Sequence, residues 1–255
     1  MSLLSSFILG CVEGITEFLP ISSTGHLILT ARLIGITQTN FLKSFEIAIQ
    51  LGAILSVIVL YWKLLVTDLD MLKRLAVAFI PTAVIGLVFY KVVKYYLLGN
   101  SSVVLWALFL GGIFILVFEW FYQKKNMAPE GAESISYKQA LLIGLFQSFA
   151  LVPGVSRSAA TIIGGLMLGL KRRTIVEFSF LLAVPTMACA TALDLSKNAF
   201  SFSSSELIYL SVGFITSFIT ALLAIKFLLA FIRKNNFVSF GIYRIALALL
   251  LWKII

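Results

Sequence analysis

The chain has 255 residues, of which 60% are hydrophobic and 12% charged, and its mean hydropathy is +1.05. This composition excludes an ordinary soluble domain and predicts an all-α polytopic membrane protein, because backbone polar groups in lipid must be satisfied within helices or closed barrels. The apolar runs are too long for the alternating ~10-residue strands of a membrane barrel. A net charge of +9 would suit nucleic acid, but the basic residues stand in short loops between apolar runs. We therefore expect the lipid bilayer, and no nucleic acid, as a partner.

The apolar runs, taken in chain order, predict six transmembrane helices and two re-entrant helical hairpins. Runs long enough, or nearly so, to cross ~30 Å of hydrocarbon lie at 41–62, 72–90, 101–121, 174–193, 206–227 and 237–252. Two further apolar regions, 3–35 and 137–170, are interrupted by proline and serine. Each of these two regions is expected to form two half-length helices that enter and leave on the same side.

Three predicted spans separate the hairpins, and this odd number inverts the second half of the chain relative to the first. Many transporters have such an inverted-topology repeat. We expect one membrane domain over 1–255, with repeats at 1–121 and 138–255 and a cytoplasmic linker at 122–137. The assignment puts twelve loop Lys and Arg residues on one side and six on the other, so the richer side is expected to be cytoplasmic. The first hairpin would then open outward.

One sequence pattern occurs twice. Residues 10–29 read GCVEGITEFLPISSTGHLIL, and residues 144–163 read GLFQSFALVPGVSRSAATII. In both copies a proline interrupts an apolar run, and hydroxyl residues begin the next run. The ionisable residues of the two copies are Glu13, Glu17, His26 and Arg157. Ionisable groups within apolar sequence are costly in lipid, so these residues mark a candidate functional site.

The break in each copy predicts an anion site. Proline ends the incoming half-helix, and Ser22 or Ser23 in one copy and Ser156 in the other are placed to cap the outgoing half-helix. Helix N-termini bind anions through their free N–H groups and positive dipole ends. Arg157 adds a planar guanidinium that suits phosphate.

The first copy adds the groups needed for chemistry on a bound phosphate. Glu13 and Glu17 stand four residues apart on one helix face, which suits divalent-cation binding or general acid–base catalysis. Ser23 and Thr24 offer hydroxyl nucleophiles, and His26 follows about one turn later. A hydroxyl, a base and a cationic stabiliser within reach of one another outline a phosphoryl-transfer site.

Structural roles are the alternative for each of these residues. The two glutamates would snorkel toward the interface, Arg157 would cap carbonyls or neutralise a glutamate, and His26 would hydrogen-bond within its hairpin. Helix caps or interhelical contacts are the alternative for Ser22, Ser23, Thr24, Ser156 and Ser158.

Three polar residues outside the repeated pattern are further candidates. Glu46 and Gln50 share a face near the start of their span and either reach the site or lie at the interface. Arg244 stands alone in the last apolar run, where we expect it to neutralise a carboxylate or to line the cavity.

EGITEFLPISSTGH at 13–26 and PGVSRSAAT at 153–161 resemble the two signature motifs of the bacterial undecaprenyl-diphosphate phosphatase family of the bacitracin-resistance type. FEIAIQLG at 45–52 extends the resemblance, which covers essentially the whole chain. It implies a multi-pass enzyme of the bacterial inner membrane that removes the terminal phosphate of undecaprenyl diphosphate. The product, undecaprenyl phosphate, is the recycled lipid carrier of peptidoglycan synthesis, and its recovery confers bacitracin resistance.

The resemblance also implies roles for particular residues. The acidic motif falls on Glu13 and Glu17, the acid of a third stretch falls on Glu46, and the hydroxyl and arginine motifs fall on Ser22, Ser23, Thr24, His26, Ser156, Arg157, Ser158 and Thr161. Ala159 stands where the family usually has glycine, and this departure leaves every polar group in place. The resemblance also implies a divalent cation (Mg²⁺ or Ca²⁺), for which Glu13 and Glu17 are the expected ligands, and a homodimer.

We therefore expect hydrolysis of a polyprenyl diphosphate, with Arg157, Ser156, Ser158, Thr161, Ser22, Thr24, Glu46 and Gln50 binding the substrate. Ser23 is the expected nucleophile, and the alternative is a water activated by Glu17 or His26. The active site is expected to open to the outer face. The rival hypothesis is a transporter or flippase of an anionic polyprenyl phosphate lipid, since inverted repeats with broken helices also build carriers.

Overall fold

The computed structural model describes residues 1–255 except 38, 98–99, 125–133, 199–201 and 255. All of the elements assigned in that part of the chain are helices. In order they are α1 (Leu3–Thr16), α2 (Ser23–Leu33), α3 (Asn40–Thr67), α4 (Leu69–Val92), the π-helix η1 (Val93–Leu97), α5 (Ser101–Lys124), α6 (Tyr137–Ser148), the 3-10 helix η2 (Phe149–Leu151), α7 (Arg157–Met167), α8 (Arg172–Asn198), α9 (Ser204–Phe231) and α10 (Val238–Trp252).

Five helices of the described chain are long and apolar enough to cross a membrane, which confirms a polytopic all-α membrane protein. They are formed by Asn40–Thr67, Leu69–Phe89, Ser101–Tyr122, Arg172–Ala192 and Ser204–Phe231. The sixth predicted span, 237–252, forms α10, which has only 15 residues. At 1.5 Å per residue α10 is about 22 Å long, shorter than a typical hydrocarbon core. The predicted count of six full spans is therefore not confirmed.

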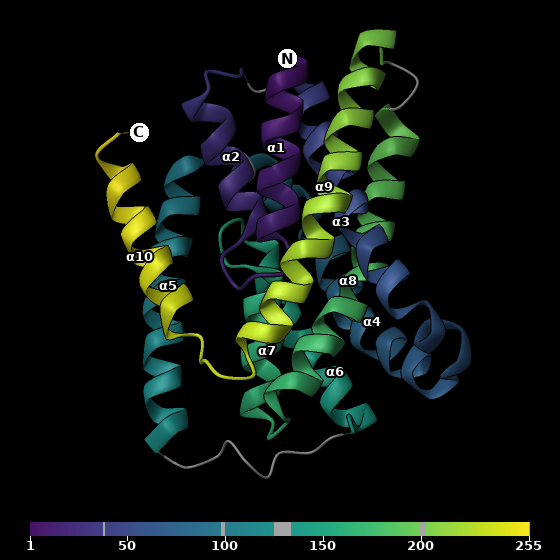
Figure 1. Ribbon diagram of the computed structural model, residues 1–255, viewed down its shortest axis with the longest axis vertical. Coiled ribbons are helices and arrows are strands. Elements are labelled where there is room, and N and C mark those ends of the chain that lie inside the picture. Colours follow the sequence, from purple (N-terminus) through teal and green to yellow (C-terminus); the bar gives the residue numbers. More distant parts are fainter. Residues whose placement is uncertain (38, 98–99, 125–133, 199–201, 255) are drawn as a thin grey trace.

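Two pairs of short helices form where the sequence predicts broken hairpins. The first pair, α1 and α2, lies at one end of the molecule and the second pair, α6 and α7, at the other (Figure 1). The turns of the two pairs meet between them. Both pairs begin with the same capping box, in which Ser2 and Ser136 each exchange hydrogen bonds with the residue three positions later. The first helix of each hairpin thus begins with the same N-terminal capping box, and a proline in the following turn prevents the helix from continuing.

The two hairpins pack reciprocally on long helices of the other half of the chain. α1 lies against α9, and α6 lies against α4. Glycines allow both approaches: a Cβ on Gly10 would lie 2.6 Å from the Gly213 carbonyl oxygen, and one on Gly144 would lie 2.0 Å from the Ala78 carbonyl oxygen. Small residues at helix interfaces in membranes permit such close backbone contact. The repeat boundaries at 121 and 138 stay a prediction.

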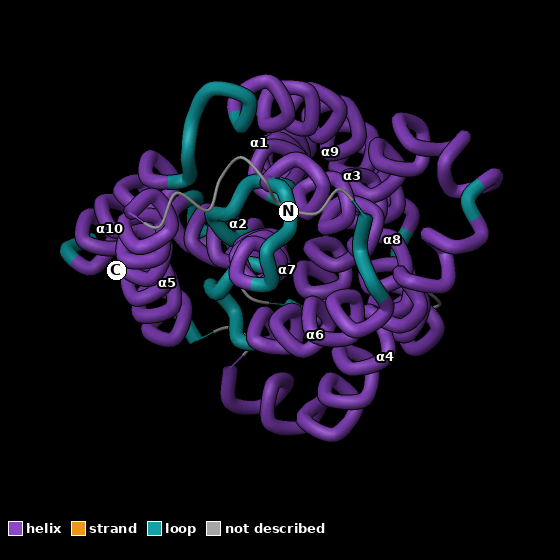
Figure 2. The backbone as a smooth tube through the Cα atoms, turned by 90° about the horizontal axis from the view of Figure 1, so that it is seen from below, coloured by secondary structure: helices purple, strands orange, loops and turns teal. Residues whose placement is uncertain are grey.

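The remaining helices complete the frame around the hairpin turns. α3 packs against α8 and α9, and α5 pairs with α10 at one edge of the bundle (Figure 2). An ion pair joins α5 to the start of α8, because the buried Glu119 carboxylate accepts hydrogen bonds from the Arg172 guanidinium. Glu119 also accepts from the Phe237 backbone N–H at 3.0 Å, which fixes the start of α10. Most of the predicted linker at 122–137 lies outside the described residues.

Candidate active site

Each hairpin turn ends on a serine that caps the outgoing helix. Ser22 accepts a hydrogen bond from the Gly25 N–H at the start of α2, and Ser156 accepts one from the Ala159 N–H at the start of α7. Both serines have positive φ angles, 73° and 79°, which are unusual for residues other than glycine. Of the two predicted caps in the first copy, Ser22 is the one formed. The chain therefore reverses in the same strained way in both turns, and the two helix N-termini face a common space.

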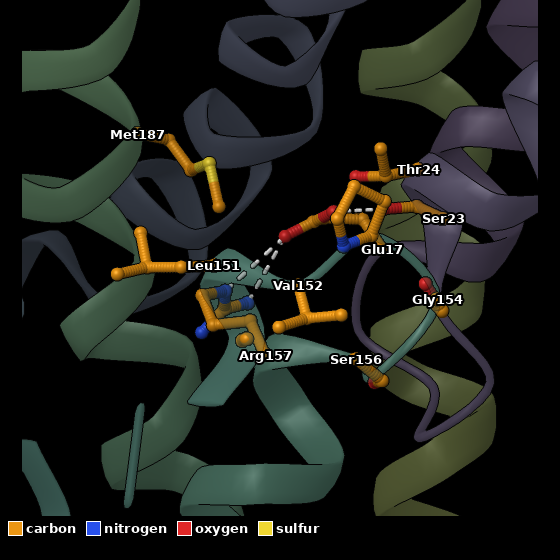
Figure 3. Close-up of a pocket in the computed structure, with 12 residues that line it drawn as sticks. Glu17, Ser23, Thr24, Leu151, Val152, Gly154, Ser156, Arg157 and Met187 are labelled. Carbon is orange, nitrogen blue, oxygen red and sulfur yellow. Dashed lines mark hydrogen bonds and ion pairs between the residues drawn. The ribbon is translucent and has the colours of Figure 1, made fainter. Parts of the chain in front are cut away.

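Glu17 lies at the centre of this space. Its carboxylate oxygen Oε1 accepts hydrogen bonds from Arg157 Nη2 at 3.1 Å and Nε at 3.3 Å, and its Oε2 accepts a hydrogen bond from the Ser23 hydroxyl. The Glu17 and Arg157 side chains are 3% and 6% exposed. Figure 3 shows the Glu17 carboxylate between Ser23 and Arg157. The predicted acid, hydroxyl and guanidinium, drawn from three helices, therefore meet at one point.

Further contacts hold Arg157 and join the two hairpins. Arg157 Nη1 donates to the Ser179 carbonyl of α8 at 2.7 Å. The Ser158 hydroxyl donates to the Leu19 carbonyl of the opposite turn at 2.8 Å. These bonds restrict the guanidinium to one orientation, which favours a fixed geometry toward a bound anion.

A cavity of about 200 Å³ opens beside these groups. Its lining is drawn from both turns and from α8: Glu17, Ser22, Ser23, Thr24, Ala150, Leu151, Val152, Pro153, Gly154, Ser156, Arg157 and Met187. Six of the predicted site residues are among them (Glu17, Ser22, Ser23, Thr24, Ser156 and Arg157). The apolar residues Ala150, Leu151, Val152 and Met187 were not predicted, because nothing in the sequence separates them from ordinary membrane-facing residues.

Glu13 lies one helical turn before Glu17 and is completely buried. Both of its carboxylate oxygens lack a hydrogen-bond partner, and so does Oε1 of Glu46 on α3. Unpartnered buried carboxylate oxygens are costly and suit a cation as the missing partner. In the described chain no group of three or more His, Cys, Asp and Glu side chains is arranged as a metal site. Any cation would therefore take its remaining ligands from substrate or water, as Mg²⁺ commonly does.

His26 is turned away from the cavity. Its Nδ1 lies 2.7 Å from the Ser22 carbonyl oxygen, and its Nε2 lies 2.9 Å from the Tyr243 hydroxyl of α10. Because a carbonyl only accepts, Nδ1 carries a proton, and in the neutral ring Nε2 accepts from Tyr243. Both nitrogens are thus occupied in structural hydrogen bonds, the alternative that the sequence left open.

Four other predicted residues lie outside the cavity lining: Ser158, Thr161, Glu46 and Gln50. Thr161 is buried within α7, and its hydroxyl bonds to the Ser179 hydroxyl at 2.6 Å. Glu46 and Gln50 stand on α3 and are partly buried. The Thr161 hydroxyl also bonds to the Arg157 carbonyl oxygen at 3.0 Å, so Thr161 supports the start of α7 and is not part of the cavity lining.

Arg244 of α10 has a position that the sequence did not predict. It is fully buried, and its guanidinium donates only to backbone carbonyls. In the first turn it bonds to Pro20, in the second turn to Gly154 and Val155, and on α5 to Ala107 and Leu108. The expectation that Arg244 neutralises a carboxylate or lines the cavity is wrong, because the two turns present unpaired carbonyls that a fork of five donors satisfies.

Comparison with protein-family models identifies the chain. The model described as "Bacitracin resistance protein BacA" matches residues 6–250. The chain belongs to the BacA family. The match includes both hairpin turns and every residue that lines the cavity.

Curated relatives of this BacA chain carry one name. A protein of Aquifex aeolicus named undecaprenyl-diphosphatase is 53% identical over 242 residues, which cover 95% of this chain and 94% of the relative. A protein of the same name from Wolinella succinogenes is 53% identical over 98% of this chain and 97% of its own length. One from Bdellovibrio bacteriovorus is 45% identical over 98% of this chain and 95% of its own length.

Proposed function

We propose that this chain is an undecaprenyl-diphosphatase, which hydrolyses the terminal phosphoanhydride bond of undecaprenyl diphosphate to undecaprenyl phosphate and inorganic phosphate. Membership of the BacA family and the shared name of the relatives support this proposal. The observation that carries it is the Glu17 carboxylate, which accepts a hydrogen bond from the Ser23 hydroxyl on one oxygen and hydrogen bonds from the Arg157 guanidinium on the other. A hydroxyl paired with a base next to a fixed guanidinium suits phosphoryl transfer.

In the proposed reaction the diphosphate occupies the cavity between the two helix N-termini. Arg157 and the first-turn N–H groups of α2 and α7 would bind its phosphate oxygens. Glu17 takes the Ser23 proton, the Ser23 oxygen bonds to the terminal phosphorus, and the bond to the bridging oxygen breaks. Undecaprenyl phosphate leaves, and water then hydrolyses the phosphoserine to inorganic phosphate. The competing route has Glu17 deprotonate a water that attacks the same phosphorus directly.

A divalent cation is part of the proposal. Glu13, whose two oxygens are buried and unpartnered, and Glu17 would hold it. When bound, such an ion would neutralise part of the diphosphate charge. Glu13 would thus serve the reaction by binding the cation and not by moving a proton.

The proposed location is the bacterial inner membrane, with the cavity open to the outer face. The excess of Lys and Arg on the side opposite the first hairpin supports this orientation. The isoprenoid lipid is the proposed substrate partner. The homodimer stays a prediction that light scattering of the purified protein would test.

The test is phosphate release by purified protein in detergent micelles that contain undecaprenyl diphosphate and Mg²⁺ or Ca²⁺. Stoichiometric release by the wild type, lost in the Glu17→Gln variant, would support the proposal. A protein that releases no phosphate but moves the labelled lipid between leaflets of a vesicle would overturn it in favour of the carrier. Glutamine is nearly isosteric with glutamate, so we expect the variant to fold. A gel-filtration profile that matches the wild type would check this.

A further inference from the structure

A second hollow, an apolar groove, lies beside the active-site cavity on the membrane-facing side of α5. Its volume is about 470 Å³. Six residues of α5 and two of the second hairpin turn form it: Ser102, Val103, Trp106, Ala107, Leu110, Gly111, Val152 and Val155. Apart from the Ser102 hydroxyl and the Trp106 indole, these side chains are aliphatic or absent. The α5 residues recur at helical spacing, so the groove follows one face of the helix for about 13 Å.

The groove and the polar cavity share a wall. Val152 lines both, and Figure 3 shows it in the active site close to Arg157. The neighbouring turn residues alternate, since Val155 faces the groove whereas Gly154 and Ser156 face the cavity. The turn is pressed against α5 here, because a Cβ on Gly154 would lie 2.8 Å from Ala107 Cβ. One short segment therefore separates a polar chamber from an apolar channel.

The outer rim of the groove is exposed. Trp106 and Leu110 are 53% and 55% exposed in the chain. Trp106 packs edge-on against Trp252 of α10, with ring centroids 4.8 Å apart. This contact fixes the position of the Trp106 indole at the rim of the groove.

We propose that this groove binds the part of the isoprenoid chain nearest the diphosphate, so that α5 and Val152 align the substrate with its phosphates at Arg157. The inference rests on the proposed function. A substrate with a charged head and an apolar tail needs a polar chamber next to an apolar channel, and here the two lie on either side of one short turn. The apolar lining and the volume suit binding driven by burial of hydrocarbon.

The first experiment fills the groove. Val103→Trp places an indole in the channel without touching a polar group of the site. Val117→Trp makes the same substitution on an exposed face of α5 outside the groove, where Val117 is 47% exposed. We expect Val103→Trp to lower kcat/KM for undecaprenyl diphosphate by about tenfold, because tail burial contributes to transition-state binding. Val117→Trp should match the wild type, and inhibition by inorganic diphosphate should be the same in all three proteins.

The second experiment locates the tail without requiring turnover. A polyprenyl diphosphate with a diazirine in its first isoprene unit is photolysed with the wild-type protein, and the labelled peptide is found by mass spectrometry. Labelling within 102–111 or at Val152 and Val155 supports the groove, even in a protein that releases no phosphate. Labelling confined to other helices, with equal kcat/KM for the two Trp variants, overturns the groove while leaving the phosphatase proposal intact.

Discussion

The Arg157 guanidinium lies 3.1 Å from the Glu17 carboxylate, although 140 residues separate them in the chain. Each comes from a different broken hairpin, and both are buried. A buried charge without its partner is strongly destabilising, so the pair requires the two turns to stay together. The same carboxylate accepts a hydrogen bond from Ser23 on one oxygen and from Arg157 on the other, so the nucleophile and the phosphate-binding group lie on opposite sides of the base.

The pair leads to the first prediction. Glu17→Gln removes the proton acceptor of Ser23 and should lower phosphate release by about 10³-fold. Arg157→Lys keeps the charge but loses the planar fork and should cost about 100-fold. Phosphate release and gel filtration of both variants in detergent would check this. Near-normal turnover in either, with an unchanged elution profile, would contradict the assigned site.

Ser23 and Thr24 provide a matched comparison of neighbouring hydroxyls. Both line the cavity, but the Ser23 hydroxyl is the one that donates to Glu17. If Ser23 is the nucleophile, Ser23→Ala should abolish turnover by at least about 10³-fold, whereas Thr24→Ala should lose much less. Acid quenching of a reaction with substrate ³²P-labelled at its terminal phosphate should trap label on Ser23. A rapid reaction with no trapped label would favour the water route.

Glu13 should act through the cation. Chelation by EDTA is expected to stop phosphate release, and added Mg²⁺ or Ca²⁺ should restore it. Glu13→Gln should raise the cation concentration needed for half-maximal activity, because one of two anionic ligands is lost. Full activity in EDTA would remove the cation from the proposal, and an unchanged cation requirement in Glu13→Gln would remove Glu13 as its ligand.

Arg244 should stabilise both turns and take no part in the chemistry. Arg244→Met leaves buried carbonyls of both turns and of α5 without donors, at a cost of about 3 kcal/mol of folding free energy. Arg244→Lys supplies fewer donors and should fall between Met and wild type. Thermal melting in detergent would rank the three proteins. A Met variant that melts like the wild type but loses activity would assign Arg244 a direct role instead.

Close helix contact predicts unequal effects of two similar substitutions. Gly144→Ala forces a methyl group toward the Ala78 carbonyl oxygen and should destabilise the protein by about 1–3 kcal/mol. Gly86→Ala on α4 meets its nearest atom, Leu151 Cδ2, at 3.5 Å and should be neutral or slightly stabilising. Melting temperatures would test the pair, and equal values would argue against the close contact of α6 with α4.

The sequence predicted the parts of this site that depend on local rules. A proline followed by serines defines each turn and its cap, and the odd number of intervening spans brings Glu17 toward Arg157. Other features depend on contacts between distant segments. The direction of the His26 ring is set by Tyr243, 217 residues away, and the partners of Arg244 exist only once two turns meet. The segment of α10 was predicted as a span because its apolar run, 237–252, is nearly long enough to cross the hydrocarbon, but a helix of 15 residues is too short to do so.

The reciprocal packing of α1 on α9 and of α6 on α4 has a consequence for the integrity of the chain. A fragment that ended near residue 124 would contain Glu17 but expose the glycine-bearing face of α1 to lipid. The complementary fragment would contain Arg157 but would lack α4, so the face of α6 that carries Gly144 would also be exposed. Neither fragment contains a complete helix bundle or a complete active site. We therefore expect the two fragments to be active only when they associate.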